Sequence, residues 1–234
     1  MGTADDLRHF YRTANENKLR EKLQNEINSA LNTEHQLFTK ELDTRQKITK
    51  CRQKLRALEN CSNLSDICLF EATPLTDFFM NICYACDLAL AGTGKRVVFS
   101  GDADSAFICR EAVMRQTLNI ISNAALYSDS AVISAELKEI NQQAFLTICS
   151  SGYPDLPKMQ NSLKKTGSGL WYVSNVSHLH GAAALFYCCD GLLHAGIRLK
   201  TSAIKTQRPV SDFTSLLCDR LSPVYTHLST VEGI

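Results

Sequence analysis

Residues 5–60 contain neither glycine nor proline. These two residues interrupt helices more strongly than any others, so the stretch can be helical throughout. Apolar residues recur in it at steps of three, four or seven, with charged residues of both signs between them, which is typical of an amphipathic helix. The apolar positions are Leu19, Leu23, Ile27, Ala30, Leu31, Leu37, Phe38, Leu42, Ile48, Leu55 and Leu58.

The helical stretch has one candidate break, at Asn32 and Thr33. Thr33 and Gln36 have the spacing of a capping box, in which two side chains bond the open backbone donors of a helix start. We therefore favour two antiparallel helices, with one long helix as the alternative. In either form the apolar stripe is too narrow to bury itself, so we expect residues 1–62 to form a homodimer.

The overall composition is that of a globular protein, with 44% hydrophobic and 21% charged residues. A net charge of +1 provides no general attraction for nucleic acid or an anionic membrane. The longest apolar stretch, residues 78–91, is too short to span a bilayer, and the N-terminus has no secretory signal pattern. We expect a cytoplasmic protein without a nucleic-acid partner or a membrane span.

Ten cysteines are irregularly spaced, which fits a reducing compartment. Cys83 and Cys86 have C-x-x-C spacing, but they lie within a helical apolar pattern and no second pair stands at zinc-site distance. We therefore expect them to pack in the core, as small hydrophobic residues do.

After residue 61 short strand patterns alternate with helical ones. Strands are predicted at 67–71, 96–100, 107–109, 131–140, 144–150, 182–189 and 192–200, and helices at 74–91, 110–127 and 168–180. Asp190-Gly191 is a strong hairpin turn between the last two strands. Helices cannot separate every pair of strands, so the class is α+β. We place a domain at 63–201, followed by a tail of unassigned role, 202–234, with a possible helix at 211–221.

The predicted helix 110–127 carries a polar stripe opposite its apolar surface. Gln116, Asn119, Asn123 and Tyr127 fall three and four residues apart and so share one face. An unpaired buried amide costs roughly 1–3 kcal/mol, so these groups need partners. They either bond backbone or solvent, or they line a ligand site in which amide oxygens suit a hard cation such as magnesium.

A second candidate lies at residues 164–170. Gly167 and Gly169 come just before a predicted helix, whose open N–H groups can bind phosphate, and Lys164 and Lys165 add positive charge. A Gly-x-Gly string alone is usually only a turn.

In their order, three segments resemble the nucleotide-binding boxes of histidine kinases, in the GHKL superfamily that also includes gyrase and MutL. Residues 115–128 resemble the N box, 146–157 the first glycine box, and 167–181 the second glycine box with its helix. The resemblance covers about residues 65–200, and the combined pattern is specific although each box alone is not. It implies a two-layer α/β sandwich, with a mixed sheet covered on one face by helices.

The resemblance implies ATP and magnesium as ligands, with Asn123 bridging to the metal. Asn119 stands where hydrolytic members have a glutamate base, and an amide cannot take a proton, which suits a kinase. The implied nucleotide-binding residues are Asn119, Asn123, Tyr127, Ser151, Gly152, Lys164, Lys165, Gly167, Ser168, Gly169 and Leu170.

The boxes also depart from the family pattern. The first glycine box normally has an aspartate that accepts a hydrogen bond from adenine, whereas Ser150 and Ser151 occupy that place and Asp155 is displaced. Losing the charge-assisted part of that bond costs about 1–2 kcal/mol, or about tenfold in affinity. Trp171 replaces a later glycine, so its bulk is expected to crowd the pocket, and residues 157–167 are short for an ATP lid.

A histidine kinase also needs a phosphoacceptor. His9 stands near the start of the first helix at a usual distance before the N box, and His35 begins a His-Gln-Leu-Phe-Thr string near the expected hairpin tip. Neither has an acid directly after it, and either can be an ordinary exposed histidine.

Three functions fit these features. The first is a sensor kinase that phosphorylates His9 and passes the phosphate to a response regulator. The second is a catalytically weak pseudokinase or phosphotransfer scaffold that acts as a dimeric adaptor. The third, an anti-sigma-factor kinase, normally lacks a long helical arm, so residues 5–60 argue against it.

Overall fold

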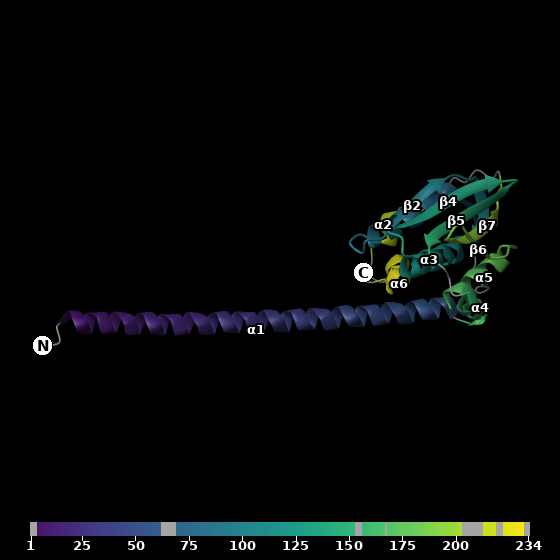
Figure 1. The fold of residues 1–234 in the computed structure, drawn as a ribbon. Coiled ribbons are helices and arrows are strands. Elements are labelled where there is room, and N and C mark those ends of the chain that lie inside the picture. Colours follow the sequence, from purple (N-terminus) through teal and green to yellow (C-terminus); the bar gives the residue numbers. More distant parts are fainter. Residues whose placement is uncertain are drawn as a thin grey trace. The chain divides into compact units, whose positions relative to one another are not determined.

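The computed structural model describes residues 4–61, 69–152, 156–166, 168–202, 213–218 and 222–231 (Figure 1). The chain divides into two units, Met1–Ile48 and Thr49–Ile234. The last turns of the first helix therefore belong to the same compact unit as the strands.

Helix α1 (Ala4–Cys61) is continuous across the expected break. The hydroxyl of Thr33 donates to the carbonyl oxygen of Ser29, 2.9 Å away and one turn earlier. Thr33 therefore forms its hydrogen bond within the continuous helix and does not cap the start of a second helix. The favoured helical hairpin is wrong, and the single long helix is the observed form.

The remaining elements follow in alternation. They are β1 (Phe70–Pro74), α2 (Leu75–Ala89), β2 (Arg96–Gly101), β3 (Ser105–Cys109), α3 (Arg110–Tyr127), β4 (Val132–Ile140), β5 (Gln143–Ser151), α4 (Leu156–Lys164), α5 (Gly169–Leu179), β6 (Leu185–Cys189), β7 (Leu192–Lys200), the 3-10 helix η2 (Phe213–Leu216) and α6 (Pro223–Leu228).

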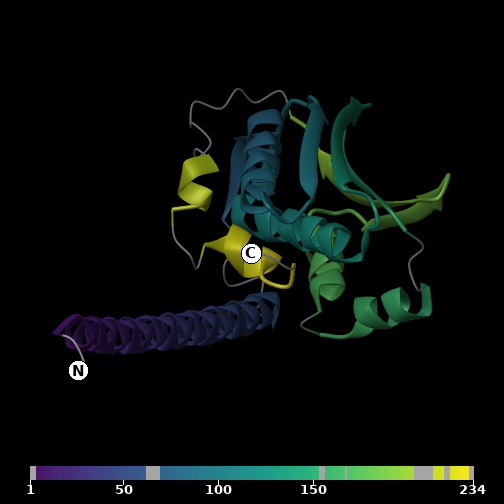
Figure 2. The same cartoon turned by 60° about the vertical axis from the view of Figure 1, so that its left-hand side comes forward.

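The main sheet has the strand order β2-β4-β5-β7-β6. β2 and β4 are parallel and the other pairs antiparallel, while β1 and β3 form a separate antiparallel pair. Every second residue of β5 is buried, and α2 and α3 pack on that side of the sheet (Figure 2). The predicted α+β, two-layer sandwich is confirmed.

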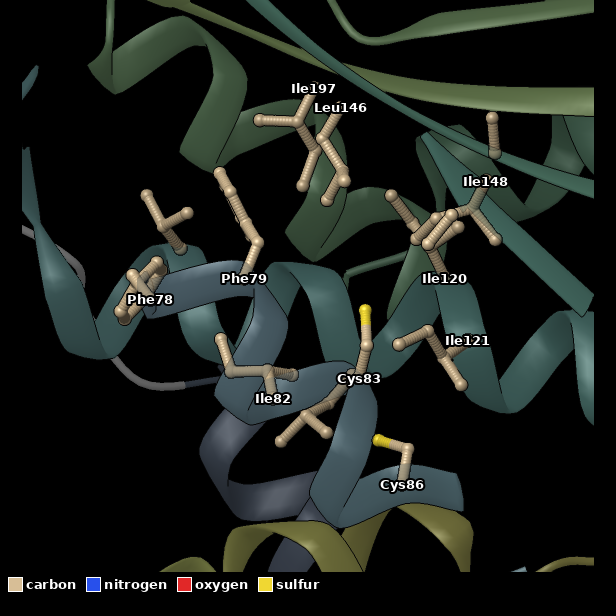
Figure 3. Close-up of a cluster of buried hydrophobic side chains, with 14 of the residues drawn as sticks. Phe78, Phe79, Ile82, Cys83, Cys86, Ile120, Ile121, Leu146, Ile148 and Ile197 are labelled. Atoms are coloured by element: carbon tan, nitrogen blue, oxygen red, sulfur yellow. The ribbon is translucent and has the colours of Figure 1, made fainter. Parts of the chain in front are cut away.

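The core lies between this sheet face and the two helices. Figure 3 shows Phe79 and Ile82 of α2 near Ile120 and Ile121 of α3, with Leu146 from β5 above them. Burying such aliphatic and aromatic side chains contributes about 1.5–3 kcal/mol each, and the helices depend on it.

The two thiols of the C-x-x-C string lie in this core. Cys83 and Cys86 are almost completely buried, and desolvation raises the pKa of Cys83 to about 12. No cluster of metal-ligating side chains exists among the described residues. Their interpretation as core residues is confirmed.

Two hairpin turns use the left-handed backbone region. Asp190 and Gly191 have φ of 51° and 77°, as a type I′ turn requires, so the predicted hairpin is confirmed. Asn141 and Gln142, with φ of 50° and 59°, make the same kind of turn between β4 and β5.

The structure differs from the sequence prediction in several places. β1 begins at Phe70 and β6 at Leu185, each three residues later than expected, and α4 is a helix that the sequence did not predict. Of the helix predicted at 211–221, residues 213–218 are described, and they form only the short η2 instead of an α-helix. The later α6 begins with proline at its first turn. Val224 and Leu228 of α6 are completely buried. None of the described helices is both long and apolar enough to cross a membrane.

Candidate functional site

A cavity of about 320 Å³ opens between α3, the end of β5, α4, the start of α5 and the β6–β7 hairpin. This volume is at the lower end of the range for small-molecule sites, about 300–1,000 Å³. Its lining is Ile120, Asn123, Ala124, Tyr127, Ile148, Ser150, Ser151, Gly152, Met159, Ser162, Leu170, Phe186, Leu193 and Ala195.

Helical and strand periodicity place these residues together. Ile120, Asn123 and Tyr127 lie three and four apart on α3, so one face of that helix forms a wall. Ile148 and Ser150 are alternate residues of β5 that point to the helix side of the sheet.

The chain just after β5 lies close to the end of α3, in a backbone conformation that favours glycine. Gly152 has φ of +115°, and a Cβ at this position would lie 3.3 Å from the carbonyl oxygen of Tyr127. The missing side chain lets the two backbones meet at the edge of the cavity.

The polar groups of the cavity are neutral. Asn123, Ser150 and Ser162 have side chains that make no hydrogen bond within the described part of the chain. The hydroxyl of Ser151 lies 3.1 Å from that of Ser128. No charged side chain appears in the lining formed by the described residues. The cavity therefore offers donors and acceptors within a mainly apolar wall, which suits a ring system with polar edges.

Five of the residues implied by the resemblance line this cavity. They are Asn123, Tyr127, Ser151, Gly152 and Leu170. Asn119, Lys164, Lys165, Ser168 and Gly169 do not line it. Gly167 lies outside the described residues.

Ser168 has a structural role at the start of α5. Its hydroxyl accepts a hydrogen bond from the backbone N–H of Trp171 at 3.1 Å and donates to the carbonyl oxygen of Ser162. This N-cap fixes the turn between α4 and α5. The indole of Trp171 is partly buried against the core and is not part of the cavity lining, so it does not crowd the pocket as expected.

The polar stripe of α3 has two roles: part of it bonds neighbouring helices, and part of it lines the cavity. The amide of Gln116 donates to the Val173 carbonyl oxygen at 3.0 Å and to the Ser177 hydroxyl at 2.7 Å, and so joins α3 to α5. Asn119 is completely buried, and both ends of its amide are bonded to α1. Asn123 alone of these three faces the cavity.

The partners of Asn119 are residues that the sequence did not single out. Arg56 donates to the Asn119 amide oxygen at 3.1 Å, to the Ser122 hydroxyl at 2.7 Å and to the His227 carbonyl oxygen at 2.9 Å. Asn60 accepts from the Asn119 amide nitrogen at 3.0 Å. The polar face of the helix end is therefore buried.

The apolar stripe of α1 ends differently from the prediction. Leu58 is 70% exposed, whereas Arg52 is only 7% and Asn60 only 3% exposed. Arg52 lies over the ring of Tyr225, 5.2 Å from its centroid. The spacing of residues 52, 56 and 60 by four places them on one helix face. Charged residues between leucines are usually solvated, so this spacing alone does not indicate a buried face.

Burial shifts the charged groups of this junction. Burial lowers the pKa of the Arg56 guanidinium. Burial also lowers the pKa of His227, and the positive charges of Arg56 and Arg115 lower it further, whereas Glu59 acts to raise it. Burial acts to raise the pKa of Glu59, but His227, Arg115 and Arg56 together lower it. At neutral pH, Glu59 is thus held as a carboxylate.

Both candidate phosphoacceptors, His9 and His35, fall in α1, but their side chains lie outside the described residues. His180 has a structural role. Its ring accepts from the backbone N–H of Cys109 at 3.2 Å and contacts the Val176 carbonyl oxygen at 2.8 Å, while burial lowers its pKa.

Comparison with solved structures identifies the fold. The catalytic domain of histidine kinase ThkA matches with a TM-score of 0.51 at 12% identity, over 57% of this chain and 96% of that domain. Histidine kinase AdeS from Acinetobacter baumannii matches with a TM-score of 0.50 at 15% identity, over 63% and 76% of the two chains. Full-length ShkA, in complex with AMPPNP, matches with a TM-score of 0.54 at 13% identity, over 68% of this chain and 37% of its own.

At the level of sequence there is no match to a protein-family model or to a curated protein. At these low identities the structural likeness concerns the fold alone. The compact domain therefore has the histidine-kinase-like fold of the GHKL ATP-binding domains.

Proposed function

We propose that the cavity beside α3 binds ATP with magnesium and that the protein is a histidine-kinase-like signalling protein. The observation that supports this most is a set of polar side chains, Asn123, Ser150 and Ser162, which face one cavity between α3 and α5 and make no hydrogen bond to any described residue. A few polar side chains that converge on a mainly apolar cavity are typical of a small-molecule site, so this arrangement favours a ligand. That ShkA was solved with AMPPNP supports a nucleotide as this ligand.

Asn123 is the residue that would hold the magnesium ion. Its amide oxygen is a suitable ligand for a hard cation, and no described residue of the lining carries a positive charge. A bound magnesium ion would supply the charge that neutralises phosphates. The side chains of the cavity would bind and orient the nucleotide.

A second function, a dimeric adaptor with weak or no catalysis, has its own support. Ser150 stands where the family's adenine-binding aspartate is expected, and Asn119 is bonded to Arg56 and Asn60. In this case ATP would bind weakly, and phosphate would come from another kinase or not be used at all.

Two further parts of the proposal concern α1. Leu37, Phe38 and Leu42 are 62%, 65% and 47% exposed, which favours a homodimer through this helix. His9 would accept the phosphate, and a response regulator would be the partner that receives it.

Isothermal titration of the full chain with magnesium and ATP tests the first step. We expect saturable binding that weakens at least about tenfold in Asn123→Ala, since a charged or metal-linked contact contributes about 1.5–3 kcal/mol. Asn161→Ala, at an exposed position of α4, is the matched control and should bind as the wild type does. An absence of binding at millimolar ATP would leave only the adaptor.

Incubation with radiolabelled ATP then separates the two functions. A kinase would give an acid-labile, base-stable label that disappears in His9→Gln. An acid-stable label would indicate phosphoserine instead, and no label with intact binding would support the adaptor.

A further inference from the structure

The end of α1 docks through polar side chains, among them Arg56 with three hydrogen bonds. Its guanidinium reaches Asn119 and Ser122 on α3 and the backbone of His227 on α6. Three acceptors on two elements fix the guanidinium in position, because its planar donors have set directions.

Both ends of the Asn119 amide are hydrogen-bonded to the end of α1. Its oxygen accepts from Arg56 and its nitrogen donates to Asn60, so the orientation of the amide depends on α1. Asn119 is fully buried, so losing either partner would leave a buried polar group unpaired.

The held amide lies directly against the first residue of α5. A Cβ at Gly169 would be 2.7 Å from the Asn119 amide oxygen and 3.6 Å from the Arg56 Nη2 atom. The next residue, Leu170, lines the cavity, as does Ile120, which follows Asn119 on α3. The hydrogen-bonded pair of Arg56 and Asn119 therefore lies next to the two parts of the lining that α3 and α5 contribute.

The junction around this pair is incompletely bonded. Buried polar atoms without a hydrogen bond within the described part of the chain include Arg115 Nε, Gln116 Oε1, Ser222 Oγ and His227 Nδ1, while His227 Nε2 lies 3.3 Å from the Glu59 carboxylate. A hydrogen bond has a set direction, which apolar packing lacks, so the hydrogen bonds that are made fix the geometry of the junction.

Building on the proposed nucleotide binding, we propose that Arg56 is a positioning residue of the cavity. It acts through Asn119, whose amide it orients against Gly169, and so holds the first turn of α5 and the wall of α3 at the spacing that a nucleotide requires. The last turns of α1 thereby control the affinity of a site that they do not touch.

Arg56→Gln and Arg56→Lys in the full chain test this role. Without nucleotide, backbone amides of residues 169–172 should exchange with solvent about tenfold faster in Arg56→Gln, because the start of α5 opens more often. The dissociation constant of ATP with magnesium should rise about tenfold, equivalent to losing one hydrogen bond to a charged group. Arg56→Lys keeps the charge and should recover part of both effects.

Val97→Ala is the matched control, since Val97 is 5% exposed on β2, at the edge of the sheet opposite β6. It should lower the melting temperature without changing ATP affinity or exchange at residues 169–172. In an Asn119→Ala background, Arg56→Gln should have little further effect on either readout.

The outcomes separate this role from the proposed function. If the wild type binds no ATP, nucleotide binding fails, and the exchange of residues 169–172 still decides the role of Arg56. If Arg56→Gln lowers only the melting temperature, with exchange and affinity as in Val97→Ala, Arg56 is structural and its positioning role is refuted.

Discussion

Single hydroxyl groups determine what the cavity can recognise. Ser150 is 8% exposed and contributes a group that both donates and accepts hydrogen bonds, where a carboxylate would only accept. The amide of Asn123 has the same double capacity. The described lining therefore selects its ligand through shape and neutral hydrogen bonds. A charged side chain introduced into this lining should change the affinity for the ligand.

Ser150→Asp is expected to bind ATP about tenfold more tightly than the wild type. A carboxylate that accepts from the adenine amino group gains a charge-assisted bond worth about 1–2 kcal/mol more than a neutral one. Calorimetric titration with ATP and with ITP, which has a carbonyl in place of the amino group, measures the effect. An equal change for both nucleotides would show that residue 150 does not face the amino group.

His227 makes stability depend on pH. It is completely buried, and burial, with Arg56 of α1 and Arg115 of α3, lowers its pKa, while Glu59 of α1 acts in the opposite direction. The unfolded chain, with a histidine pKa of about 6.5, then binds the proton more tightly than the folded one. Stability is thus complete above about pH 6.5 and falls as the pH drops below that value.

His227→Gln should therefore flatten the fall in melting temperature between about pH 7 and pH 5. His180 has a pKa lowered by burial too and remains in the variant, so part of the slope will persist. The lowered pKa of Glu59 acts in a more acidic range, below its ordinary value of 4.5. Identical slopes for variant and wild type would mean that His227 has the same proton affinity in the folded and unfolded chain.

At the scale of elements, α3 and α5 are held at a fixed spacing by small residues and buried amides. Gln116 bonds α5 directly, and Gly169 leaves just enough room for Asn119. Because α5 begins at this contact, a single methyl group is enough to disturb it.

Gly169→Ala is expected to destabilise the protein by about 1–3 kcal/mol, as overpacking does. The new Cβ would lie 2.7 Å from the Asn119 amide oxygen and 3.2 Å from its amide carbon, so the two helices must separate. Urea denaturation measures the loss. It should shrink when Asn119→Ala is also present, since the obstructing amide is then absent. An undiminished loss in the double variant would place the strain elsewhere.

Elements with a strong local pattern could be predicted from the sequence, and contacts between distant segments could not. The bounds of α3 and the Asp190-Gly191 turn follow from local periodicity and turn chemistry, and both agree with the structure. Arg56 and Asn119 are 63 residues apart, and no local pattern tells a buried arginine from a solvated one. For the same reason the polar stripe of α3 predicted one site, whereas the structure divides it between a cavity and a docked helix.

At the scale of the whole molecule, α1 carries apolar side chains that its own unit does not cover. Phe38 and Leu42 lie one turn apart and are 65% and 47% exposed. Exposed pairs such as Arg45 with Glu41 keep the rest of the surface soluble but contribute little to stability. A second copy of α1 is the partner of matching length and periodicity, as in a coiled coil.

Phe38→Glu and Leu42→Glu should each weaken the dimer about a hundredfold or more. Each change removes two copies of a side chain worth about 1.5–3 kcal/mol when buried and introduces two like charges at the interface. Gln36→Glu is the control, since it adds the same charge at an exposed polar position pointing to a different side of the helix. Sedimentation equilibrium over a range of concentrations gives the dissociation constants. A wild-type chain that is monomeric at high micromolar concentration would disprove the dimer, and equal weakening by all three variants would mean that charge, not apolar burial, controls the association.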